Sequence, residues 1–125
     1  MKPDNIQNVT IINDFIRSQP WLDVDLYTYD STDLILIGGI DLTAYHQIEI
    51  KFRSVHCYHG VFHWHTDTSR PFFDIPKGSE LIDLNGKYSI ERGHDLFRIF
   101  PEDHNGPIII AAENCIPSIK TVYYK

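Results

Sequence analysis

The hydrophobic pattern changes period once, near Pro20, and this change constrains the fold more than any other feature of the 125-residue chain. Between Pro3 and Pro20 the apolar residues recur at steps of three and four, which is typical of an amphipathic helix, with Asp4 or Asn5 available as a cap. From Trp21 onward apolar and polar residues alternate, which indicates half-buried strands. We therefore predict an α+β domain, in which one N-terminal amphipathic helix packs on a mainly antiparallel β-sheet of about seven or eight strands.

Turn signals predict how some of these strands connect. Asn85-Gly86 lies between two alternating segments and predicts a two-residue β-hairpin. Asn105-Gly106 predicts that residues 97–100 turn back toward residues 108–110. The continuous apolar run 34–37, which two glycines follow, indicates a central strand. No repeat or composition break marks a linker, so we expect one domain over residues 1–125.

The charge balance and the cysteine count exclude several classes of protein. The chain has 11 Lys and Arg against 17 Asp and Glu, a net charge of −6, so it lacks the positive excess that nucleic-acid binding requires. Cys57 and Cys115 are too few for a disulfide framework. The longest apolar run, residues 34–40, is far shorter than the roughly 20 residues that span a bilayer. We expect a cytoplasmic protein with no membrane or nucleic-acid partner.

Five of the seven histidines fall between residues 46 and 65. If His59-Gly60 forms a two-residue hairpin turn, His56 pairs with His63, and His65 lies beside them on the same face. Cross-strand Cβ atoms lie about 4.5–5.5 Å apart, so the three imidazoles are candidate ligands for a divalent metal such as zinc. The alternative is a solvated face without a common ligand. The same register places four apolar side chains on the other face: Val55, Cys57, Phe62 and Trp64.

The C-terminal quarter carries a local family resemblance. The segment 97–104, followed by the runs 108–112 and 119–125, resembles the last strands of the cupin-like sugar-anomerase family associated with sialic-acid pathways. That resemblance implies a metal-binding histidine at His104. It also implies a metal-dependent or sugar-binding protein that uses the histidine cluster. The upstream histidine, tyrosine and aspartate motif of that family is not reproduced around residues 45–49.

An acidic segment suggests a binding surface. Residues 21–41 contain five aspartates and no lysine or arginine. With the alternate leucines and valine pointing inward, Asp23 and Asp25 project outward beside Tyr27 and Tyr29. Acids speed the encounter with a basic protein and aromatic side chains supply contact area, so this strand is a candidate partner-binding face.

A second resemblance concerns the class of protein. The strand phrase 45–55, which follows a tryptophan-aspartate strand, is similar to phrases in small bacterial immunity-type families. This similarity implies a stoichiometric inhibitor that covers a basic toxin, and it assigns no roles to individual residues. The primary hypothesis is therefore a non-enzymatic protein-binding module without a cofactor. A metal-dependent or sugar-binding cupin-like protein is the alternative, and an exposed sheet edge leaves a homodimer open.

Overall fold

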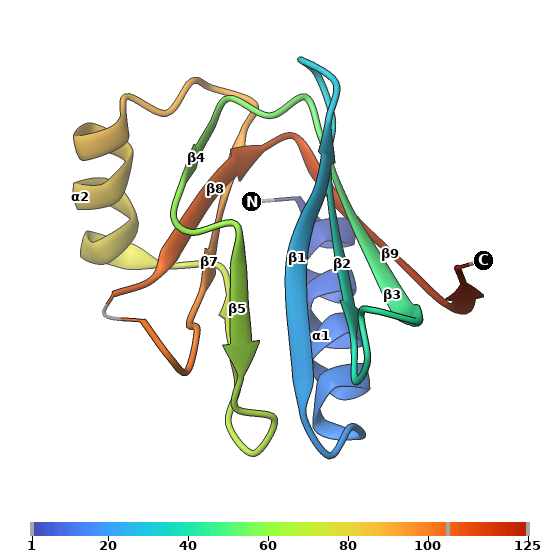
Figure 1. Cartoon of the computed structure of the whole chain (residues 1–125). Coiled ribbons are helices and arrows are strands. Elements are labelled where there is room, and N and C mark those ends of the chain that lie inside the picture. The colour runs from blue at the N-terminus through green and yellow to red at the C-terminus, as the bar shows by residue number, and fades with distance from the viewer. Residues whose placement is uncertain (1, 105, 125) are drawn as a thin grey trace.

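The computed structural model describes residues 2–104 and 106–124, and within these residues it shows two helices and nine strands (Figure 1). The elements follow one another along the chain as α1 (Pro3–Arg17), β1 (Leu22–Tyr29), β2 (Leu34–Gly39), β3 (Tyr45–Arg53), β4 (Cys57–His59), β5 (His63–Thr66), β6 (Phe73–Asp74), α2 (Gly78–Tyr88), β7 (Asp95–Ile99), β8 (Ile108–Ala112) and β9 (Asn114–Tyr123). The α+β class is confirmed. The strands form two antiparallel sheets, however, and not the single sheet that the sequence predicted.

The two sheets are joined at one corner. One sheet has the strand order β5-β1-β2-β3-β9 and the other has the order β4-β8-β7-β6. The β3–β9 ladder leads into the β4–β8 ladder through two backbone hydrogen bonds, from Glu113 N to Arg53 O (2.9 Å) and from His56 N to Ala111 O (2.7 Å). The paired chains therefore bend from one sheet into the other without losing their pairing, as strands do at the corners of packed sheets.

The helix α1 agrees with the predicted amphipathic segment. Its buried face includes Val9, Ile12 and Ile16, and it packs against β9 and β6, the edge strands of the two sheets. It therefore closes the side of the molecule between those edges. Neither helix is long and apolar enough to cross a membrane, for the part of the chain that the structure describes.

Neither predicted cap residue caps α1. The N-cap is Lys2, which makes no side-chain cap hydrogen bond. Asn5 is fully buried and points toward the corner between the sheets. Its Nδ2 donates to Asp95 Oδ2 (2.7 Å) and to Glu113 O (3.0 Å), and its Oδ1 accepts the N–H of Cys115 (3.0 Å). Asn5 thus fastens the helix to the point where β8 passes into β9.

The alternation seen in the sequence is confirmed in the core. Leu22 and Val24 of β1 and the inward residues of β3 are buried, as are all five residues of β8. At the centre of the core, the ring of Phe52 meets that of Phe97 edge-on, with centroids 5.4 Å apart. The largest fully buried side chains are Trp64, Phe52, Phe73, Phe97, Ile12, Ile16, Leu22, Leu36, Ile48, Leu96, Ile99 and Ile108.

The hairpin predicted at Asn85-Gly86 is wrong, because these residues lie inside α2. Leu81, Leu84 and Tyr88 are half-buried at steps of three and four, which is the helical pattern that the turn signal obscured. The helix ends at Tyr88, and its C-cap residue, Ser89, has a left-handed backbone (φ 53°). Outside the core, α2 is held by the ion pair between Arg98 Nη1 and Glu80 Oε2 (2.8 Å).

The hairpin predicted at His59-Gly60 is also wrong. β4 pairs with β8 in one sheet and β5 pairs with β1 in the other, so residues 60–62 cross between sheets. Gly60 is needed for close packing rather than for a turn, since a Cβ there would lie 2.7 Å from Cγ1 of Ile108. Trp64 is buried as predicted, whereas Phe62 is 69% exposed and Cys57 is only half-buried.

The predicted pairing of residues 97–100 with residues 108–110 is confirmed. β7 and β8 pair antiparallel, with Phe97 opposite Ile110 and Ile99 opposite Ile108. Of the predicted turn residues, Asn105 lies outside the described residues.

Candidate functional site

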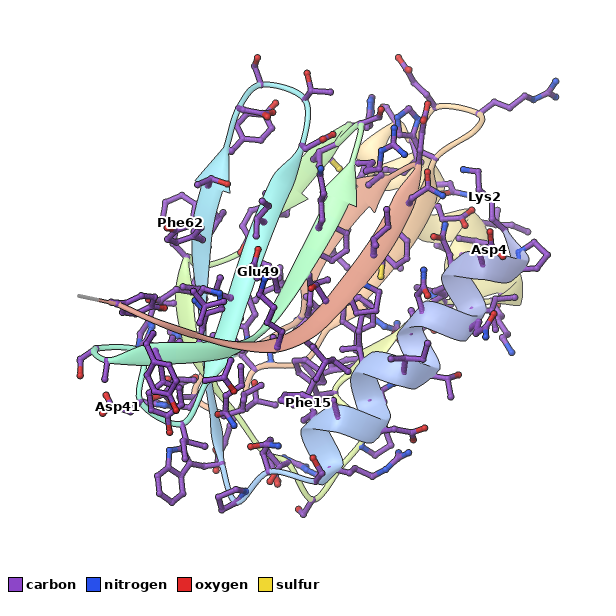
Figure 2. The ribbon with its side chains drawn as sticks, turned by 90° about the vertical axis from the view of Figure 1, so that its right-hand side faces the viewer. Lys2, Asp4, Phe15, Asp41, Glu49 and Phe62 are labelled. Carbon is purple, nitrogen blue, oxygen red and sulfur yellow. The ribbon has the colours of Figure 1, made fainter. Side chains whose placement is uncertain are left out.

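The candidate site is the outer face of the five-stranded sheet, on the side away from the second sheet. Figure 2 looks onto this face, with Glu49 of β3 labelled near its centre and α1 lying beside it. Leu22 and Val24 of β1 are buried, so Asp23 and Asp25 between them face outward. In β5, Trp64 is buried between two exposed histidines in the same way.

Two aspartate–histidine pairs connect β1 and β5 on this outer face. The strand register places Asp23 opposite His65 and Asp25 opposite His63. In each pair the Oδ1 of the aspartate contacts the Nδ1 of the histidine. The two imidazole rings lie 5.7 Å apart between centroids, with an interplanar angle of 74°. The result is a compact group of two carboxylates and two imidazoles.

Further acids surround His65. Its backbone N–H donates to Asp103 Oδ1 (3.1 Å), and its carbonyl oxygen accepts the N–H of Glu102 (2.9 Å), so residues 102–103 border the free edge of β5. The hydrogen bond with Asp23 and the charge of Asp23 raise the pKa of His65, burial opposes this rise, and the charges of Asp103 and Glu102 add smaller increases. The surroundings of His65 thus favour its cationic form.

A second group lies next to these pairs. His46 of β3 is buried, with 3% of its surface exposed. A register shift between His46 and Ile48 accompanies a ring that lies against Tyr27 and Glu49 on the outer face, and not in the core beside Ile48. Its Nδ1 lies 2.7 Å from the hydroxyl of Tyr124 and its Nε2 lies 3.0 Å from Glu49 Oε2. The pKa of Tyr124 is raised by burial, and the charges of Tyr27, Asp25 and Glu49 raise it further. The ring of Tyr27 on β1 lies next to that of His46, so the two groups are neighbours on one acidic and aromatic surface.

The four predicted partner-binding residues are divided between two faces. Asp23, Asp25 and Tyr27 belong to the outer face, and Tyr27 is 57% exposed with its ring centroid 6.2 Å from that of His46. A β-bulge at Tyr27 shifts the alternation by one residue, so Tyr29 pairs with the buried Leu34. Tyr29 is 55% exposed but faces the other side of the sheet. The bulge leaves no signal in the alternation pattern from which it could be predicted.

Tyr29 borders an apolar groove that the sequence did not predict. The groove has a volume of about 490 Å³ and lies where the ends of β1 and β2 face β4. The rings of Tyr58 and Phe62 stack at its rim, 6.2 Å apart. Burial raises the pKa of Tyr58 to about 12, and its hydroxyl donates to the carbonyl of Val61. The groove is lined by Leu26, Tyr29, Leu34, Val55, His56, Cys57, Tyr58 and Phe62.

The structure does not bring the three predicted metal ligands together. His63 and His65 are neighbours, but His56 lies just before β4 of the second sheet, where its Nε2 donates to Ser89 O (3.0 Å) and its ring lies 5.4 Å from that of His94. His104, the metal position that the cupin resemblance implied, lies 3.8 Å from Asp103. Within residues 2–104 and 106–124, no group of three or more His, Cys, Asp or Glu side chains is placed to hold a metal ion.

Neither thiol of the chain is activated as a nucleophile. Burial raises the pKa of Cys115 to about 12. Burial also raises the pKa of Cys57, against the opposing effect of a hydrogen bond with the Ala111 backbone. Both thiols are therefore protonated at neutral pH.

The chain matches no protein-family model, no curated protein and no solved structure. The proposed function therefore depends on the residues of the outer face.

Proposed function

We propose that the protein is a non-enzymatic binding module that neutralises a basic protein, in the manner of small bacterial immunity-type proteins. The observation that supports this function is the outer face of the five-stranded sheet (Figure 2), on which carboxylates of β1 and β3 accompany Tyr27 and Tyr124. A cytoplasmic location suits this function and the two free cysteines.

The charge of this face favours a basic partner. Between Arg17 and Lys51 the chain contains six Asp and Glu residues and no lysine or arginine. Three of these acids, Asp23, Asp25 and Glu49, belong to the outer face. A surface of one charge sign steers an oppositely charged protein toward it and raises the association rate, with a strong dependence on ionic strength.

The aromatic residues supply contact area at low entropic cost. Tyr27 is 57% exposed, and Tyr124 is held by His46. Trp21 is 54% exposed, yet its Nε1–H donates to Ile40 O (3.0 Å), which fixes the indole ring. Tyrosine and tryptophan dominate the binding energy of many interfaces, and side chains that are already ordered lose less conformational freedom on binding.

The aspartates are ordered in the same way. Each carboxylate is held by a histidine across the strand pair, so the acidic array exists before a partner arrives. Preorganised charges bind with a smaller ordering cost than charges on mobile side chains.

The test first screens small basic bacterial toxins for one that the immobilised protein retains, and then titrates the protein with that toxin. Calorimetric titration at low and high salt should give a tight one-to-one complex that weakens as salt rises. The double variant Asp23→Lys/Asp25→Lys should weaken binding by at least about 100-fold and flatten the salt dependence, since removing charges buried in an interface costs about 2–5 kcal/mol.

A matched control carries the same change of charge elsewhere. Asp83 on α2 and Glu91 after it are exposed and lie outside the outer face. The Asp83→Lys/Glu91→Lys variant should bind nearly as the wild type does. Unchanged affinity and salt dependence in the Asp23→Lys/Asp25→Lys variant would refute the proposed face.

A further inference from the structure

His63 and His65 present a pair of ring nitrogens to solvent. They stand two residues apart on β5 and flank the buried Trp64, so both rings leave the strand on the outer face. Their side chains are 57% and 54% exposed. The Nδ1 atoms contact the aspartates of β1, while neither Nε2 has a hydrogen-bond partner within the part of the chain that the structure describes.

The spacing of the rings is close to that of two imidazoles on one metal ion. With metal–nitrogen distances of about 2.0–2.1 Å and a nitrogen–metal–nitrogen angle of about 90–109°, the ring centroids lie roughly 4.5–5.2 Å apart. The observed separation is 5.7 Å. The remaining difference is about 0.5–1.2 Å, which small rotations of two exposed side chains would close.

The aspartates give this pair a property that two solvated histidines lack. A histidine that binds a metal through one nitrogen usually donates its other ring N–H to a carboxylate, which fixes the tautomer and makes the coordinating nitrogen more basic. Asp25 does this for His63 and Asp23 does it for His65. In the neutral form of each ring the proton stays on Nδ1 and the lone pair is on Nε2. A metal ion therefore displaces the second proton of a cationic ring, and the two carboxylates add attraction for a cation.

We infer that His63 and His65 form a two-histidine chelating site for a divalent transition-metal ion. Imidazole nitrogens suit Cu²⁺, Ni²⁺ and Zn²⁺, and Cu²⁺ binds most strongly in this series. Water fills the remaining coordination positions, because the site lies on an open face. His56 is not part of this site. Metal binding also does not depend on the proposed basic partner, so the metal site and the binding function can be tested separately.

The experiment titrates the metal-free full chain with one equivalent of CuCl₂. Calorimetry should give one high-affinity site, and the electron paramagnetic resonance spectrum should show hyperfine splitting from two imidazole nitrogens. His63→Ala and His65→Ala should each weaken binding by at least about 100-fold, because the chelate is reduced to a single ligand. Asp23→Asn/Asp25→Asn should weaken it by about 10–100-fold while both nitrogens remain bound.

The chain offers a matched control in its other histidine pair. His56 and His94 have ring centroids 5.4 Å apart, but the Nε2 of His56 is occupied by the carbonyl of Ser89. The His56→Ala/His94→Ala variant should keep full copper affinity and the two-nitrogen spectrum. Loss of affinity in this control, a one-nitrogen spectrum in the wild type, or wild-type affinity in His63→Ala or His65→Ala would overturn the inference.

Discussion

Substitution of Asn5 by alanine should destabilise the protein more than its position near the start of α1 suggests. The side chain makes three hydrogen bonds at the corner between the sheets, to Asp95, Glu113 and the backbone N–H of Cys115. Asn5 and Cys115 are both fully buried. Water therefore cannot replace the lost partners without a rearrangement of the corner.

The expected cost follows from these three bonds. Each bond to a neutral backbone group contributes about 1 kcal/mol, and the bond to the Asp95 carboxylate contributes about 1.5–3 kcal/mol. The higher helix propensity of alanine offsets about 0.5 kcal/mol of this loss in the free energy of unfolding. Asp95 also accepts the backbone N–H of Lys2 (2.9 Å), which keeps the net loss toward the lower end. We expect Asn5→Ala to lower the free energy of unfolding by about 3–4 kcal/mol.

Two further variants separate the hydrogen bonds from other effects. Asn8→Ala, on the same helix, removes one half-exposed bond to Cys115 O (2.8 Å) and should cost only about 0.5 kcal/mol. Asn5→Asp keeps the size and one acceptor oxygen, but it places a carboxylate against that of Asp95, so it should cost at least as much as Asn5→Ala. Urea unfolding followed by circular dichroism measures all three. A cost for Asn5→Ala below about 1 kcal/mol, or equal to that of Asn8→Ala, would refute the reasoning.

Three shorter predictions concern other parts of the molecule. A thiol reagent should label Cys57 in the native protein and reach Cys115 only after unfolding, because Cys115 is fully buried; equal native rates would contradict this. The pKa of His65 is raised in the folded state, so its pair with Asp23 stabilises the fold below the unfolded pKa of about 6.5, and this contribution disappears as the pH rises through the folded pKa. Asp23→Asn should therefore cost more stability at about pH 5.5 than at about pH 9, by at most about 1 kcal/mol for so exposed a pair, and an equal cost at both values would count against it. Gly60→Ala should lower the free energy of unfolding by about 1–3 kcal/mol, since the new methyl group would overlap the isoleucine that begins β8, and a wild-type unfolding midpoint would contradict this packing.

Local periodicity predicted most of the elements, because it depends on neighbours within one turn or one strand. The helix at the N-terminus and the alternating strands β1 and β3 are present where the pattern placed them. Turn dipeptides predicted the strand connections less well, because asparagine and glycine also occur inside helices and at close packing contacts. Asn85-Gly86 lies within a helix, and Gly60 is required by a contact with Ile108, which is distant in sequence.

The candidate site shows the same division between local and distant information. The alternation within β5 predicted correctly that His63 and His65 point outward. This prediction does not depend on which strand pairs with β5, so it holds although the predicted partner strand was wrong. The partner itself is fixed by long-range packing, which joins β5 to β1 and sends β4 to the second sheet. Asp23 and Asp25, which the sequence assigned to a separate surface, therefore face these histidines directly.

This juxtaposition makes the two proposed activities compete for the same carboxylates. A divalent ion on His63 and His65 would add two positive charges next to Asp23 and Asp25, and so cancel the charge that attracts a basic protein. One equivalent of copper should thus slow association of the basic partner by about 10-fold at low salt, with little effect at high salt. The same addition should leave the His63→Ala variant unaffected, since that variant keeps both acids but loses the chelate. Stopped-flow association with and without copper measures the difference, and an equal slowing of wild type and variant would mean that copper acts at another place.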